Sequence, residues 1–218
     1  MELFKYHFEQ LENKTLYYNP FDDTYNNNGV KQHVAYPTFK KFIEELMKNY
    51  NSSTNILEVG TAASTEKNIG LYDVNSTYLF DNIVRKYGGH FWTCDIDNDK
   101  IEAITPKLCP ASCAINTDGM LFLHTWSTKL PDLSANVYLD TCDISEPYLI
   151  NANKCYNEYI SIKSALNKDS LLLINNSPSV NYITKNYDEK NNCSTFIQKD
   201  IKNSFILDHK YQLLYKFN

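Results

Sequence analysis

Carboxylate and amide side chains stand where the predicted buried strands of this chain end. Glu58 and Gly60 close the first strand, Asp95 closes the second, and Asp118 and Gly119 follow the third. In an open α/β sheet, ligands bind beyond the carboxyl ends of the strands. A carboxylate such as Asp95 can accept hydrogen bonds from both hydroxyls of a ribose, and Asp118 could meet an adenine amino group. The glycines would let the backbone approach such a ligand closely. The pattern is therefore compatible with a ligand that carries a ribose and an adenine.

A second polar group follows the fourth and fifth predicted strands. Asp140 ends the fourth strand and Asp143 follows shortly after it, while Asn175 and Asn176 end the fifth. A carboxylate beside a reacting hydroxyl can take its proton, so both aspartates are candidate catalytic bases. His124 is a rival base, although the pattern around it is more typical of a helix face.

Periodic patterns place these residues on alternating strands and helices. Apolar residues at helical spacing predict helices within residues 37–50, 76–88, 99–104, 120–126 and 148–166. Short buried runs predict strands at 55–60, 91–95, 113–117, 136–140 and 170–175, and a terminal hairpin is expected at 204–207 and 211–217. This alternation predicts a doubly wound, mostly parallel α/β sheet, to which the hairpin adds antiparallel strands.

The composition limits the classes of function. The 218 residues carry 26 acidic against 21 basic side chains, with a net charge of −5, and Arg85 is the single arginine. Because Lys and Arg make most phosphate contacts, this balance argues against a nucleic-acid partner. No apolar run is long enough for a membrane span and no signal peptide is recognised, so a cytoplasmic protein is expected. The 6 cysteines include no CxxC pair and are expected to be reduced structural thiols.

In the order and spacing of its motifs, the chain resembles the class I S-adenosylmethionine-dependent methyltransferases over roughly residues 36–217. Glu58 and Gly60 look like the first motif of that family, Asp95 like the acid after its second strand, and Asp118-Gly119 like its adenine-contacting motif. The resemblance implies a seven-stranded Rossmann-like sheet in a domain at 36–218, preceded by an arm at 1–35 in which His33 could help to close the site. The implied cofactor-binding residues are Glu58, Gly60, Thr61, Ser64, Asp95, Ile96, Asp118, Gly119 and Asp140.

The residues after the fourth and fifth strands are similar to those of metal-assisted O-methyltransferases, including the catechol and macrolide-sugar types. That resemblance implies that Asp140, Asn175 and Asn176 hold Mg²⁺, with Asp143 as the base. A bound Mg²⁺ would take oxygen ligands and acidify the hydroxyl to be methylated. Without a metal, Asp140 or Asp143 could act alone.

The resulting hypothesis is an S-adenosylmethionine-dependent O-methyltransferase that acts on a sugar or glycan hydroxyl, with Mg²⁺ as an optional second cofactor. Its partners would be small molecules or glycans rather than nucleic acid or a membrane, and a homodimer is compatible with the sequence. One alternative is a binding module that keeps the cofactor fold without catalysis, since Ala62-Ala63 stand where a second loop glycine is usual. Another alternative is a methyltransferase for small phenols, which should depend strictly on Mg²⁺.

Overall fold

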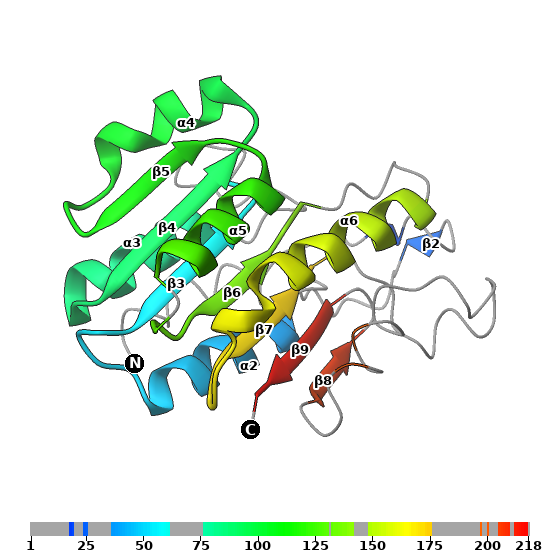
Figure 1. The fold of residues 1–218 in the computed structure, drawn as a ribbon. Coiled ribbons are helices and arrows are strands. Elements are labelled where there is room, and N and C mark those ends of the chain that lie inside the picture. The colour runs from blue at the N-terminus through cyan, green and yellow to red at the C-terminus, as the bar shows by residue number, and fades with distance from the viewer. Residues whose placement is uncertain are drawn as a thin grey trace.

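The computed structural model describes residues 18–19, 24–25, 36–61, 76–130, 132–141, 148–175, 197, 200, 205–209 and 212–217. A seven-stranded sheet with the order β5-β4-β3-β6-β7-β9-β8 forms its centre (Figure 1). The strands are β3 (Asn55–Val59), β4 (His90–Asp95), β5 (Ser112–Asn116), β6 (Asn136–Leu139), β7 (Leu171–Ile174), β8 (Phe205–His209) and β9 (Gln212–Lys216). The first five pair in parallel, and β9 runs antiparallel to both β7 and β8. The expected α/β fold, mostly parallel with an antiparallel terminal hairpin, is confirmed.

Helices alternate with the parallel strands, as the sequence pattern predicted. They are α2 (Tyr36–Lys48), α3 (Ser76–Tyr87), α4 (Asn98–Ile104), α5 (Gly119–Lys129) and α6 (Tyr148–Ile162), with short 3₁₀ turns at Thr105–Lys107 and Lys163–Ala165. The first helix ends two residues before its expected end at Tyr50. The Tyr50 hydroxyl instead donates a hydrogen bond to the Gly88 carbonyl at 2.7 Å, which ties this segment to the end of α3.

Two apolar layers sandwich the sheet. Successive side chains of a strand point to opposite faces, so Ile56 on β3 packs with α2 and α3, whereas its neighbours Leu57 and Val59 pack with α5 and α6. Trp92 on β4 lies against Trp126 on α5, with ring centroids 6.0 Å apart, as expected for core packing. This burial fixes the strand ends, because slipping any strand by one residue would move each of its side chains into the opposite apolar layer, where the neighbouring side chains differ.

The chain reverses its direction of travel across the sheet at β3. It proceeds from β3 to β4 and β5 on one side, and then returns to β6 and β7 on the other. Such a switch point opens a crevice at the carboxyl ends of the strands, where ligands of doubly wound folds bind. Here the backbones remain linked beyond the strands, since the Asp140 N–H donates to the Val59 carbonyl at 2.7 Å and the Gly60 N–H to the Cys94 carbonyl at 2.9 Å.

Two further sequence expectations concern the N-terminal arm and membrane spans, which are not part of the seven-stranded sheet. Within the expected irregular arm, two short strands, β1 (Tyr18–Asn19) and β2 (Thr24–Tyr25), pair antiparallel, and the rest of residues 1–35 lies outside the described residues. None of the described helices has the length and apolarity to cross a membrane.

The expectation for the cysteines holds only in part. Cys94, Cys109 and Cys113 are free thiols. Cys155 on α6 is disulfide-bonded, to a partner outside the described residues. The expectation that all cysteines are reduced is therefore wrong for Cys155, because spacing along the chain does not show which side chains the fold brings together.

Candidate functional site

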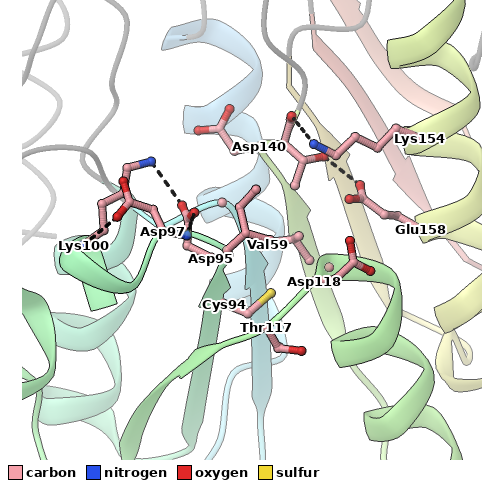
Figure 2. A pocket seen from close by; sticks show the side chains of 14 residues that line it. Val59, Cys94, Asp95, Asp97, Lys100, Thr117, Asp118, Asp140, Lys154 and Glu158 are labelled. Atoms are coloured by element: carbon pink, nitrogen blue, oxygen red, sulfur yellow. Dashed lines mark hydrogen bonds and ion pairs between the residues drawn. The ribbon is translucent and has the colours of Figure 1, made fainter. Parts of the chain in front are cut away.

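A cleft of about 440 Å³ opens at the carboxyl ends of β3, β4, β5 and β6. Six of the residues predicted from the sequence line it, namely Gly60, Asp95, Ile96, Asp118, Gly119 and Asp140. Figure 2 shows Asp95 and Lys100 on one side of the cleft, with Lys154 and Glu158 of α6 on the other. The parallel topology thus gathers side chains from widely separated segments at one edge of the sheet.

Asp95 is held rigidly at the mouth of β4. Its carboxylate accepts the backbone N–H of Thr61 at 3.2 Å and that of Asp97 at 2.9 Å. The Lys100 ammonium also lies 3.2 Å from the same carboxylate. Next to it, the side chain of Ile96 is 75% exposed and lines the cleft. An oriented acceptor beside an uncovered apolar surface suits a ligand that has a hydroxyl-bearing ring and a flat base.

Asp118 and Gly119 form the start of α5. The Asp118 carboxylate caps the helix by accepting the N–H groups of Met120 at 2.9 Å and Leu121 at 3.2 Å. At Gly119 there is no room for a side chain, because a Cβ would lie 2.3 Å from Cγ1 of Val59. Both residues therefore position the helix against β3, and Asp118 still lines the cleft.

Glu58 lies below the cleft instead of lining it. The carboxylate is fully buried and accepts hydrogen bonds from the hydroxyls of Ser76, of Thr77 at 2.6 Å and of Thr93 at 2.7 Å. The Thr93 hydroxyl in turn lies 2.8 Å from that of Thr61, just after β3. Burial raises the pKa of Glu58 to about 8, although the three hydroxyls act in the opposite direction. Glu58 thus joins the turn after β3 to β4 and to the start of α3.

Glu158 on α6 is a cleft residue that the sequence reasoning missed. Its side chain is 1% exposed, and its carboxylate accepts the Thr141 hydroxyl at 2.8 Å. The Lys154 ammonium donates to the Thr141 carbonyl at 3.0 Å, which fixes the segment after β6 (Figure 2). Burial raises the pKa of Glu158 to about 7. The available signal was an acid three residues after Cys155 on the apolar stripe of the predicted helix.

Asp140 takes part in a chain of side-chain hydrogen bonds that runs from the cleft into the interior. Its carboxylate accepts the Asn175 amide N–H at 2.5 Å, and the Asn175 carbonyl oxygen accepts the Gln212 amide N–H at 2.8 Å. Sequence reasoning predicted Asn175 but not Gln212. Asn176 lies outside the described residues.

The two described members of the predicted metal set do not fit Mg²⁺ in this arrangement. Mg²⁺ needs oxygen ligands, whereas Asn175 presents its nitrogen to Asp140 and gives its oxygen to Gln212. In the described part of the chain there is also no cluster of three or more His, Cys, Asp or Glu side chains that could hold a metal.

Of the remaining predicted residues, the structure describes Thr61 and His124. Thr61 contacts the carboxylate of Asp95 through its backbone, at the start of the loop after β3. Ser64, Asp143 and His33 lie outside the described residues. His124 is exposed on α5 and does not line the cleft, which agrees with a position on a helix face.

The fold, but not the sequence, finds counterparts among known proteins. No protein-family model and no curated protein matches the chain. The MycE methyltransferase of the mycinamycin biosynthetic pathway, solved in complex with Mg and SAH, superposes with a TM-score of 0.52 at 13% identity, over 84% of this chain and 49% of MycE. The chain therefore spans about half the length of MycE.

A smaller protein gives a similar result. An rRNA methylase from Streptococcus thermophilus superposes with a TM-score of 0.51 at 10% identity, over 83% of this chain and 97% of the methylase. Likeness at such low identity concerns the architecture and leaves the substrate open. At these TM-scores the chain shares the overall fold of both methyltransferase structures.

Proposed function

We propose that this chain is an S-adenosylmethionine-dependent O-methyltransferase whose acceptor is a hydroxyl of a sugar or glycan. The observation that carries the proposal is the pairing of Asp95 with Ile96 at the cleft mouth. Asp95 offers fixed acceptors for ribose hydroxyls, and the uncovered Ile96 side chain offers a surface for the adenine. A volume of about 440 Å³ also lies within the usual range of sites for cofactors.

The charge of the cleft supports a cationic cofactor and a neutral acceptor. Five acidic side chains line it against two lysines, namely Asp95, Asp97, Asp118, Asp140 and Glu158 against Lys100 and Lys154. A sulfonium ion gains from this excess of negative charge, whereas a nucleic-acid backbone would be repelled. The structure of MycE with Mg, SAH and mycinamycin VI is an example of a protein of this fold that holds a small molecule together with the cofactor product.

The proposed mechanism divides the work between the two sides of the cleft. Bound S-adenosylmethionine would supply an electrophilic methyl group. Asp95 would orient the cofactor, because methyl transfer is an in-line displacement in which positioning supplies much of the rate. Asp140 or Asp143 would accept the proton of the acceptor hydroxyl as its oxygen bonds to the methyl carbon.

Binding of the cofactor product tests the first half of this proposal. Adding S-adenosylhomocysteine should raise the melting temperature of the purified protein, since a ligand of the native state stabilises by RT ln(1 + [L]/Kd). Asp95→Asn should weaken binding by about ten-fold or more, because a charge-assisted hydrogen bond contributes roughly 1.5–3 kcal/mol. Asp132→Asn, at an exposed position away from the cleft, is the matched control. No thermal shift at millimolar ligand would refute the proposal.

Methyl transfer tests the second half. The protein is incubated with S-adenosylmethionine labelled in the methyl group and with separate panels of sugars, catechols and RNA. We expect the label to be transferred to the sugar panel. Asp143→Asn should reduce turnover and leave cofactor affinity nearly unchanged, because a base acts on the acceptor. Label in catechols under strict Mg²⁺ dependence would favour the phenolic alternative. Cofactor binding without transfer to any panel would favour the non-catalytic binding module.

A further inference from the structure

Three side chains from three strand ends form a hydrogen-bonded line that leads from the interior to the cleft. Gln212 begins β9, Asn175 follows β7 and Asp140 follows β6. The Gln212 amide N–H donates to the Asn175 oxygen at 2.8 Å, and the Asn175 amide N–H donates to the Asp140 carboxylate at 2.5 Å. Only the last of the three lines the cleft.

The direction of these hydrogen bonds follows from the charge of Asp140. An ionised carboxylate only accepts hydrogen bonds, so Asn175 must turn its NH₂ group toward Asp140. The Asn175 oxygen then points away from the cleft and requires a donor, which the Gln212 NH₂ group supplies. The Gln212 side chain is 1% exposed and its own oxygen has no hydrogen-bond partner among the described residues. A buried carbonyl without a partner is costly, which indicates that the donor at position 212 serves a purpose.

From this geometry we propose that Gln212 is a positioning residue, which acts through Asn175 to hold the Asp140 carboxylate where a metal ion would otherwise hold it. The inference rests on the proposed function, because the orientation of Asp140 matters only if the acceptor binds beside it. Asn175 presents an N–H group, not an oxygen, to the carboxylate. This hydrogen-bonded relay of Gln212, Asn175 and Asp140 and a metal ion bound between Asn175 and Asp140 therefore exclude each other. Transfer should then proceed without Mg²⁺.

Titration with MgCl₂ alone tests the relay without any acceptor. The wild-type protein should show no Mg²⁺-dependent change in melting temperature. Asn175→Asp places a second carboxylate beside Asp140, and it should bind Mg²⁺ at least ten-fold more tightly than the wild type does. Gln212→Met removes the donor that holds the Asn175 oxygen, so a Mg²⁺ ion at Asp140 can attract that oxygen in place of the NH₂ group, and Mg²⁺ binding should also appear. Lys216→Met, on the same strand but paired with Asp169, is the control that should remain unresponsive.

The outcomes separate this inference from the proposed function. A merely structural Gln212 would lower the melting temperature of Gln212→Met without creating a response to Mg²⁺, and that result would overturn the relay. Mg²⁺ binding by the wild type that is lost in Asn175→Ala would overturn it too, because Asn175 would then be a ligand. Binding of S-adenosylhomocysteine is measured in parallel on every variant. If no variant and not even the wild type binds S-adenosylhomocysteine, the proposed function is refuted. The Mg²⁺ titrations would still decide whether Gln212 controls metal binding at Asp140.

Discussion

Replacing Glu58 by Gln is expected to make the stability of the protein less dependent on pH. The wild-type protein should lose stability as the pH rises from about 4.5 to about 8, and the substitution should remove most of that loss. Burial raises the pKa of Glu58 from 4.5 to about 8, so the folded protein keeps this proton over a range in which the unfolded chain releases it. The stabilisation is complete below pH 4.5 and is lost as the pH rises through about 8. The loss amounts to on the order of 5 kcal/mol.

Glutamine mimics the protonated acid, and it does so at every pH. Its oxygen can accept the hydroxyls of Thr77 and Thr93, while its NH₂ group can donate to a reoriented Ser76 hydroxyl. The free energy of unfolding, measured by urea denaturation at pH values from 5 to 8.5 and constant ionic strength, should therefore fall less steeply in Glu58→Gln than in the wild type. Glu158, whose pKa is raised to about 7, contributes in the same direction and should account for part of the remaining slope.

Glu44→Gln on the exposed face of α2 is the matched control, because it removes the same charge without removing a buried group. Its stability should follow the wild-type pH dependence. Equal slopes for Glu58→Gln and the wild type would show that the Glu58 carboxylate is ionised in the folded protein across this range. The hydroxyl cluster would then outweigh the cost of burial, contrary to the expectation.

The strands and helices could be predicted because their signal is local. Runs such as Leu171–Ile174 are apolar at every position, and a run of this length between breaks in the pattern is typical of a strand covered on both faces. Chain order then placed the strand ends at one edge, since connections between parallel strands have few allowed arrangements. Asp95, Asp118 and Asp140 were found in this way, as polar residues directly after buried strands.

The partners of these residues could not be predicted, because they depend on contacts between distant segments. The sequence does not show that Glu58 accepts hydrogen bonds from three hydroxyls, nor that Gln212 contacts Asn175, which is 37 positions away in the chain. Glu58 was therefore assigned to the cofactor, whereas the structure places its carboxylate in the interior. Strand-end position predicts which residues are near the cleft, and only the packing determines which way their polar atoms face.

Replacing Gly60 by Ala is expected to destabilise the protein and to damage the cleft in the same step. Gly60 has φ +93°, which a side chain makes unfavourable, and an added Cβ would lie 2.3 Å from the backbone oxygen of Asp140. Strained backbone and overpacking each cost about 1–3 kcal/mol. Because the obstacle is backbone, relief requires β3 and β6 to separate at their ends. The free energy of unfolding should fall by roughly 2–6 kcal/mol, and S-adenosylhomocysteine should bind at least ten-fold more weakly.

Gly88→Ala separates the two causes. Gly88 follows α3 with φ +79°, but the nearest atom to an added Cβ is the Ser52 Cβ at 3.3 Å, a side-chain atom away from the cleft. That variant suffers the backbone strain without the collision, so it should lose about 1 kcal/mol of stability and keep its ligand affinity. Urea denaturation and calorimetric titration on both variants measure the two effects. If Gly60→Ala lost no more stability than Gly88→Ala and bound the ligand normally, the ends of β3 and β6 could not be as tightly joined as the Asp140–Val59 hydrogen bond indicates.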